Sequence, residues 1–305
     1  MSRPPSVSVV ITSYNHERFL RECIESVLSQ TAPPRETLLI DDASSDASPA
    51  IAKGYEGRIR PMLLTQNVGT YAALNLAIEQ ATGDWIAILN SDDAWEPRKL
   101  EAQTASLGER GFSFTNGHFV DSSGGACTYH VFGHTLMRLP SGDALVPLIY
   151  HNWCFPSTVM FQKELWHDCG RFREDLQCLG DWDLFLRMAK RTEFTFVDED
   201  LVRYRVHEAQ TSKVRVERMN REEMDIRHTR IHACEAELLA RAADRRAMAR
   251  ALAHSAAALG TLSHLFGDAR TARRWYLHSL RLYPLRGKSL LRLGLALLLP
   301  RIRTP

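Results

Sequence analysis

Short apolar runs alternate with amphipathic segments over the N-terminal third of the chain, and this alternation constrains the fold more than any other feature. Each run is rich in β-branched residues, too short for a helix and bounded by polar or turn-forming residues, as expected of buried strands. The segment Glu17–Gln30 instead places Leu20, Ile24 and Val27 on one helical face. Strands that alternate with helices predict an α/β fold with a mostly parallel central sheet flanked by helices. The expected strands are Ser6–Thr12, Thr37–Ile40, Arg60–Leu64 and Trp85–Leu89.

Cap-forming residues mark the expected starts of the later helices. Thr70 is expected to cap a helix that runs to Gln80, and Pro97 suits the first turn of a helix that ends near Leu107. The N-cap candidates for the helix before these are Ser44, Ser45, Asp46 and Ser48.

The length of 305 residues allows one sizeable α/β domain and a smaller unit. From about Asn220 the sequence is rich in Ala, Leu and Arg and almost free of Gly and Pro until Gly260. We therefore predict an α/β domain over residues 1–215 and a basic α-helical region over residues 216–305. Between them the pattern is mixed, with strands expected at 112–114, 157–161 and 193–197 and a helix at 184–189.

Composition excludes several classes of protein. Apolar residues make up 45% and charged residues 24% of the chain, which is ordinary for a globular protein and argues against disorder. The chain has no apolar run long enough to span a membrane and its start has no long apolar signal region, so we expect a cytoplasmic protein. The six cysteines lack C-x-x-C spacing, which argues against a cysteine zinc cluster and suits a reducing compartment.

The small net charge of +2 hides a strong asymmetry. Residues 1–200 carry 17 Lys/Arg against 27 Asp/Glu, a net charge of −10, and residues 201–305 carry 21 against 9, a net charge of +12. Arginines interleaved with aromatic and Leu residues from Arg270 to Arg303 suggest an interfacial helix on an anionic membrane surface. Alternatively, the Leu-rich face of this segment packs against the α/β domain or forms a dimer interface. No nucleic-acid-binding motif accompanies the charge, and the oligomeric state stays open.

Polar clusters follow three of the expected strands: Thr12–Asn15, Asp41-Asp42 and Asn90–Asp93. In open α/β sheets, ligands bind beyond the carboxyl ends of the strands, so we expect these clusters to converge there. A single strand-end Asp can simply cap the next helix, but that interpretation explains all three clusters together less well.

The Asn90–Asp93 cluster offers hard oxygen ligands of the kind that Mg²⁺ or Mn²⁺ prefers. Gly-rich phosphate loops are absent from the sequence, so a bound diphosphate would need a metal to neutralise its charge. A lone histidine such as His207 is more often structural than a ligand, and the other eleven histidines show no ligand spacing.

A second acidic segment, Gly180–Asp183, stands at the start of an expected helix. Asp183 suits an interaction with the helix dipole. Asp181 would then face the cleft, where an ionised carboxylate is a suitable base for an attacking hydroxyl.

These residues make the chain resemble the family 2 glycosyltransferases, which have the GT-A fold. The resemblance covers roughly residues 6–212. It rests on four segments in order along the chain. The first is Val7–Asn15 with the helix that follows, and the second is Leu39–Asp46. The third comprises Asn67–Gly69, Gly83–Ile86 and Leu89–Asp93, and the fourth comprises Leu179–Leu184, Leu186 and Arg187.

The resemblance implies a role for each matching residue. Asp92 would bind Mn²⁺ or Mg²⁺ directly with Asp93 beside it, and His207, in a Tyr-Arg-x-His segment, would contact the metal or the diphosphate. Asp181 would be the catalytic base. The implied nucleotide-sugar-binding residues are Thr12, Tyr14, Asn15, Asp42, Asn67, Ser91 and Asp92.

The implied reaction is a single displacement that moves a sugar, commonly from a UDP-sugar, to a hydroxyl of a glycan or lipid-linked acceptor with inversion. Two departures from the family pattern favour an alternative: Asn90 where the family often has Asp, and Gly180 where it often has Glu. The alternative is a non-catalytic protein that binds sugar nucleotides or acts as a scaffold, with a helical tail that recruits a partner.

Overall fold

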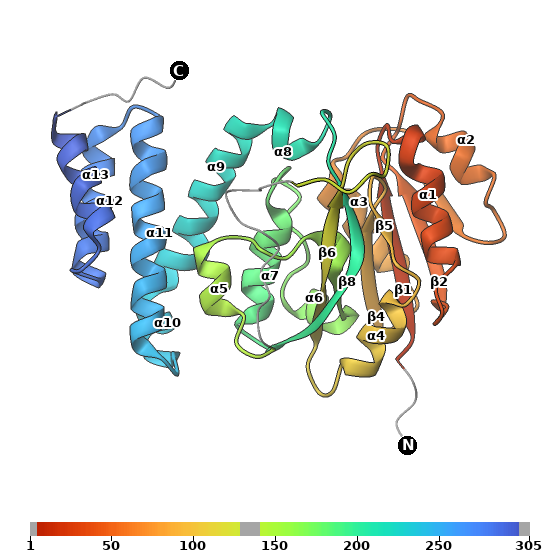
Figure 1. The fold of residues 1–305 in the computed structure, drawn as a ribbon, viewed down its shortest axis with the longest axis horizontal. Coiled ribbons are helices and arrows are strands. Elements are labelled where there is room, and N and C mark those ends of the chain that lie inside the picture. The colour runs from red at the N-terminus through yellow and green to blue at the C-terminus, as the bar shows by residue number, and fades with distance from the viewer. Residues whose placement is uncertain (1–4, 129–140, 299–305) are drawn as a thin grey trace. The chain divides into compact units, whose positions relative to one another are not determined.

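The computed structural model describes residues 5–128 and 141–298, which form two compact units (Figure 1). The first unit comprises the described residues up to Ala144 together with Trp153–Val214. The second comprises Leu145–Asn152 and the described residues from Arg215 onward. The domain boundary at residue 215 stays a prediction from the sequence, which gave no sign that 145–152 would join the helical unit.

A single sheet lies at the centre of the first unit, with the strand order β3-β2-β1-β4-β7-β6-β8-β5 over the described residues. Strands β3, β2, β1 and β4 are parallel, as are β6 and β8, whereas β7 and β5 are antiparallel to their neighbours. The α/β fold with a mostly parallel sheet is confirmed. The strands are β1 (Val7–Ser13), β2 (Glu36–Asp41), β3 (Arg60–Leu63), β4 (Trp85–Asn90), β5 (Ala94–Trp95), β6 (Phe112–Val120), β7 (Val159–Gln162) and β8 (Phe194–Arg205).

The parallel pairing brings the three polar clusters to one edge of the sheet. In the registers of β1 with β2 and β4, Thr12 lies opposite both Ile40 and Asn90, and Ser13 lies opposite Asp41. The three strands therefore end side by side, and the loops that follow them leave the sheet together. This arrangement is the convergence expected from the sequence.

Helices cover both faces of the parallel half of the sheet. The apolar face of α1, with Leu20, Ile24 and Val27, is buried in one core with Val9 and Ile11 of β1. Helix α3 packs against β1 and β2. The helices of this unit are α1 (Glu17–Leu28), α2 (Ser48–Lys53), α3 (Thr70–Gln80), α4 (Lys99–Ser106), α6 (Lys163–Asp168), α7 (Gly180–Ala189) and α8 (Thr211–Val214).

The predicted helix starts differ from the structure in detail. Helix α2 begins at Ser48, and its N-cap position is Ala47, whose side chain cannot accept a hydrogen bond. The Asp46 carboxylate instead accepts the backbone N–H groups of Ser48 and Glu17. Thr70 is the first residue of α3 rather than its cap, and Pro97 precedes α4.

The second unit is helical. A π-helical turn (Arg227–Ile231) and a 3₁₀ turn (His232–Cys234) connect α9 to α10. Helices α11, α12 and α13 pack side by side (Figure 1). Gly260 of α11 permits close approach, since a Cβ atom there would lie 2.6 Å from the ring of Tyr276 in α12. The helices are α5 (Leu145–Tyr150), α9 (Val216–Ile226), α10 (Glu235–Arg241), α11 (Arg245–Leu265), α12 (Ala269–Leu282) and α13 (Gly287–Leu298).

Among the described residues, no helix is both long enough and apolar enough to cross a lipid bilayer.

Candidate active site

Asn15 ties the loop after β1 to the loop after β2. Its backbone has a φ of 56°, a left-handed conformation that Asn tolerates better than most residues. The Asn15 N–H donates to Ser44 Oγ at 2.8 Å, and Asn15 Oδ1 accepts the Ser45 N–H at 2.8 Å. The side chain predicted to contact the donor therefore also fixes the shape of this edge.

Asp42 organises the loop that leads into α3. Its two carboxylate oxygens accept the backbone N–H groups of Val68 and Gly69 at 2.7 and 2.9 Å, and its carbonyl oxygen accepts Asn67 Nδ2 at 3.1 Å. Asp42 and Asn67, both predicted donor contacts, are thus joined directly. Because a carboxylate oxygen has two lone pairs, Asp42 can still accept a further hydrogen bond from a ligand.

Asp92, His207 and His16 form a cluster at the carboxyl ends of β1 and β4. Asp92 Oδ2 lies 3.1 Å from His207 Nε2, and one ligand atom from each of the three residues lies within 4.8 Å of the other two. The ring of His207 packs against those of His16 and Phe19, with centroids 5.7 and 5.1 Å apart. Carboxylate and imidazole are a suitable ligand set for a divalent metal, so these residues fit a cation such as Mn²⁺.

The two neighbouring carboxylates of this loop have opposite environments. Burial alone would raise the pKa of Asp92, but the hydrogen bond to His207 and the charges of His16 and His207 outweigh it and lower that pKa. Burial, and then the charge of Asp92, raise the pKa of Asp93 well above its usual value. Asp93 accepts hydrogen bonds from Ser157 Oγ at 2.5 Å and from the Arg205 N–H at 2.9 Å. The structure therefore directs Asp93 into the protein and does not bring it into the predicted metal-ligand cluster.

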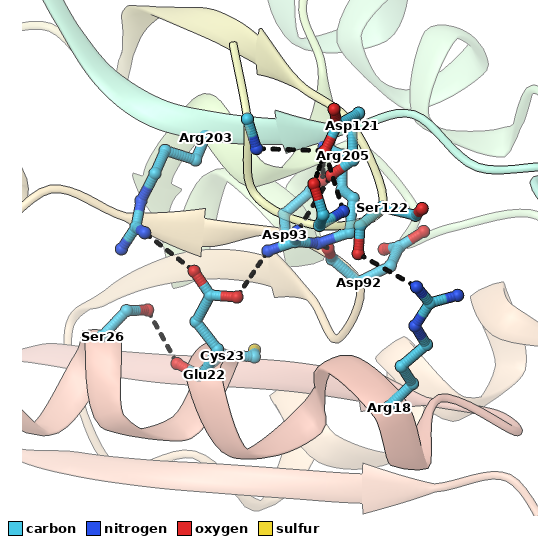
Figure 2. A network of polar contacts seen from close by, with 12 residues as sticks. Arg18, Glu22, Cys23, Ser26, Asp92, Asp93, Asp121, Ser122, Arg203 and Arg205 are labelled. Carbon is cyan, nitrogen blue, oxygen red and sulfur yellow. Dashed lines mark hydrogen bonds and ion pairs between the residues drawn. The ribbon is translucent and has the colours of Figure 1, made fainter. Parts of the chain in front are cut away.

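Arg205 of β8 holds the Asp92-Asp93 loop in place (Figure 2). Its side chain is almost fully buried, and it donates to the carbonyl oxygens of Asp92 and Asp121 at 2.9 and 3.1 Å. It also forms an ion pair of 2.5 Å with Glu22 of α1, whose other oxygen pairs with Arg203 at 2.7 Å. A single guanidinium thus connects β8, the Asp92-Asp93 loop and α1.

Asp181, the predicted base, lies in the first turn of α7 and is buried. Tyr71 Oη donates to Asp181 Oδ1 at 3.2 Å. The ring of Tyr71 lies directly over Gly180, where a Cβ atom would approach it to 2.6 Å. Gly180, one of the two departures from the family pattern, therefore has a packing reason.

Asp183 has a structural role in the same helix. Its side chain is fully buried, and it pairs with Arg187 one turn later at 2.6 Å. The two acids of this turn thus have different partners: Asp183 forms an ion pair within α7, whereas Asp181 accepts a hydrogen bond from Tyr71.

The other predicted donor contacts lie at the end of β1 and beside it. The Ser91 N–H donates to the Thr12 carbonyl at 3.1 Å, and Ser91 Oγ lies 2.8 Å from His16 Nδ1. Tyr14 is 46% exposed, as a residue that stacks on a ligand can be.

Sequence reasoning missed three residues of this site: His16, Tyr71 and Arg205. His16 directly follows the Thr12–Asn15 cluster, and Arg205 stands two residues before His207, so both lay beside recognised segments. Nothing in the sequence around Tyr71 indicates its contact with Asp181, which is 110 residues away.

Comparison with known proteins gives the family. The family model for glycosyl transferase family 2 matches residues 8–163, more than half of the chain. The chain belongs to glycosyl transferase family 2. The resemblance inferred from the sequence is therefore confirmed, and the match covers β1 to β7 with the Asp92 loop.

Two bacterial relatives show how far the similarity extends. The chain is 28% identical over 212 residues to an uncharacterised glycosyltransferase of Rickettsia typhi, and 38% identical over 165 residues to TuaG of Bacillus subtilis, a putative teichuronic acid biosynthesis glycosyltransferase. These matches cover 68% and 52% of the chain. The chain spans 66% and 63% of the two relatives.

Solved structures share the fold. TarS of S. aureus, residues 1–349 in complex with UDP-GlcNAc, superposes with a TM-score of 0.67 at 19% identity over 96% of the chain and 87% of TarS 1–349. The mannosyltransferase PcManGT of Pyrobaculum calidifontis, in complex with GDP-Man and Mn²⁺, superposes with a TM-score of 0.59 at 20% identity over 97% of the chain and 87% of PcManGT.

Proposed function

We propose that this family 2 member is an inverting, metal-dependent glycosyltransferase that moves a sugar from a UDP-sugar to a hydroxyl of a glycan or lipid-linked acceptor. The observation that carries the proposal is the Asp92, His207 and His16 cluster at the carboxyl ends of parallel strands. The complex of TarS with UDP-GlcNAc supports a UDP-linked donor, and the name of TuaG supports a polysaccharide acceptor.

The metal would be held by Asp92, His207 and His16, with Asp93 outside its coordination shell. A bound Mn²⁺ or Mg²⁺ would neutralise charge on the departing diphosphate. Arg205 and Ser157 keep the loop in the shape that presents Asp92, and the pKa shift of Asp92 keeps its carboxylate ionised.

Asp181 would act as the base. The acceptor oxygen attacks the anomeric carbon while the bond from that carbon to the diphosphate oxygen breaks, and the hydroxyl proton passes to the Asp181 carboxylate. One displacement inverts the anomeric centre. The hydrogen bond from Tyr71 orients the carboxylate, so Tyr71 is a positioning residue for the proposed base.

Turnover of nucleotide sugars by the full chain tests the proposal. We expect release of UDP from a UDP-sugar in the presence of Mn²⁺, loss of binding and release in Asp92→Ala, and loss of release alone in Asp181→Asn. Metal-dependent binding of UDP without release from any donor or acceptor would instead favour the non-catalytic alternative. The packing of Gly180 under Tyr71 explains the glycine at that position, so Gly180 does not favour the non-catalytic alternative. Asn90 remains the departure from the family pattern that favours it.

The C-terminal helices suggest the surface at which the enzyme would meet its acceptor. Exposed leucines crowd the last helix and the turn before it, among them Leu285 at 81% and Leu291 at 67% exposure. Arg281 and Lys288 are exposed nearby, whereas Arg301 and Arg303 lie outside the described residues. Apolar side chains beside cationic ones suit the surface of an anionic bilayer, so we propose that the enzyme docks at the cytoplasmic face of a membrane.

Vesicle co-sedimentation of the full chain tests the docking. Binding to anionic but not neutral vesicles, weakened by salt and lost in a Leu290→Ser/Leu291→Ser double variant, is the expected result. A protein that stays in the supernatant with anionic vesicles at low salt would contradict the docking and favour packing of the leucines in a dimer.

A further inference from the structure

A second cluster of metal-ligand side chains lies in the helical unit. Glu235 Oε2, at the start of α10, lies 2.8 Å from His232 Nδ1 and 2.8 Å from His278 Nε2. His232 belongs to the 3₁₀ turn before α10, and His278 belongs to α12. The three residues therefore join two parts of the unit that are 43 residues apart in sequence. That separation explains why the spacing of the histidines gave no ligand pattern.

The geometry is close to that of a bound ion. The three ligand atoms lie within 4.8 Å of one another, and both imidazole nitrogens point at the same carboxylate oxygen. Bond lengths of about 2.0–2.1 Å to zinc place ligand atoms about 3.3 Å apart in a tetrahedral site. The two contacts of 2.8 Å would need to lengthen by about 0.5 Å. The Glu235 and His278 side chains, which would move, are partly exposed.

The surroundings of the cluster are asymmetric. The ring of Trp275 packs against His232 and His278, with centroids 4.8 and 5.7 Å away, and so forms an apolar wall. The His232 side chain is 5% exposed, whereas those of Glu235 and His278 are 18% and 32% exposed. Solvent therefore reaches Glu235 and His278, and water can complete the coordination.

We propose that His232, Glu235 and His278 bind a zinc ion, with water as the remaining ligand. Two imidazoles and one carboxylate are a ligand set that zinc accepts with an open position. The site is separate from the Asp92 cluster, and the inference does not depend on the proposed transfer reaction. Because a metal that binds only the folded protein stabilises it, zinc would tie the turn before α10 to α12 and stabilise the helical unit.

Calorimetry with ZnCl₂ alone tests the proposal, using the full chain with Asp92→Ala to remove the other cluster. We expect the protein to bind one equivalent of zinc, and we expect this binding to raise the thermal midpoint of unfolding. Loss of an outer-shell partner typically weakens metal binding by about 10–100-fold. Because Glu235 is a proposed direct ligand, Glu235→Gln should weaken zinc binding at least as much. Glu235→Gln keeps the shape and an oxygen that accepts both imidazole N–H groups, so it separates metal binding from hydrogen bonding. His278→Ala should remove the site, and His167→Ala, whose side chain is 70% exposed, is the control.

Cobalt gives a second measurement. Co²⁺ bound in place of zinc should show visible d–d bands that disappear in Glu235→Gln and persist in His167→Ala. Zinc affinity and cobalt bands that are the same in the parent, Glu235→Gln and His278→Ala proteins would overturn the proposal and leave the three residues as a hydrogen-bonded triad.

Discussion

At the scale of single residues, Asp92 and Asp93 show how neighbouring carboxylates acquire different roles. Asp92 lies beside two imidazoles that favour its charged form, while Asp93 is buried next to Asp92 and accepts two internal hydrogen bonds. A sequence shows only that two acids are adjacent. Their separation depends on Ser157 and Arg205, which other strands and turns bring to the loop.

Asp92→Ala should abolish the stabilisation of the protein by UDP and Mn²⁺ together. The substitution removes the carboxylate from the candidate metal site, and the described part of the chain has no Gly-rich loop to bind the diphosphate instead. Asn90→Ala is the matched control and should have a smaller effect. Equal UDP affinity of the Asp92→Ala and parent proteins in calorimetry would contradict the assignment.

Asp181→Asn should separate chemistry from donor binding. The amide keeps the shape and the contact with Tyr71 but cannot accept the proton, and loss of a general base typically lowers the rate by about 10²–10⁴-fold. UDP affinity should stay near that of the parent. A variant that keeps most of its kcat would rule out Asp181 as the base.

Tyr71→Phe keeps the ring over Gly180 but removes the hydroxyl that contacts Asp181. It should therefore reduce kcat less than Asp181→Asn does and shift the pH profile of kcat/KM.

At the scale of secondary-structure elements, the contact of α7 with α3 depends on the absence of one methyl group. Gly180→Ala should destabilise the protein by about 1–3 kcal/mol, the usual range for overpacking, because the new Cβ atom would overlap the Tyr71 ring. Gly294→Ala in α13 is the control, since nothing lies within 4 Å of its Cβ position, and the better helix propensity of Ala should stabilise the protein by up to about 1 kcal/mol. Urea denaturation measures both changes, and equal midpoints for the two variants would show that the ring moves freely.

The sequence predicted the elements that depend on local pattern and missed those that depend on distant partners. Strands β1, β2 and β4 are continuous apolar runs, and the structure has them within one or two residues of the predicted limits. Strand β8 extends eight residues beyond the predicted 193–197, because β5 and β6 pair with its polar second half. The antiparallel placement of β7 between β4 and β6 has no local signal, since only its two neighbours define it.

At the scale of the whole molecule, the helical unit should be the acid-sensitive part. Burial, followed by the charges of Arg227 and Arg286, lowers the pKa of His254 in α11 to about 3. Below pH 6.5 the unfolded chain takes up a proton that the folded chain rejects, so stability falls as the pH decreases toward 3. Because of this pKa shift, protonation of His254 in the unfolded chain should make the free energy of unfolding about 2 kcal/mol lower at pH 5 than at pH 7.

Urea denaturation at pH 7 and pH 5 measures this loss. His254→Gln should reduce the difference between the two pH values by most of that amount, whereas His167→Gln, at an exposed position, should leave it unchanged. A His254→Gln protein with the same pH dependence as the parent would show that His254 titrates normally in the folded state.

The contacts of Arg205 and His207 also set the order in which the site can form during translation. Asp92 precedes the histidine that contacts it by 115 residues. At about 5–20 residues per second, a ribosome therefore needs roughly ten seconds to make that partner after it has made the Asp92 loop. A nascent chain stalled at residue 163, where the family match ends, already contains β1, β2 and β4 but has neither Arg205 nor His207. The cluster of His16, Asp92 and His207 should therefore stay incomplete until β8 emerges from the ribosome and pairs with β6.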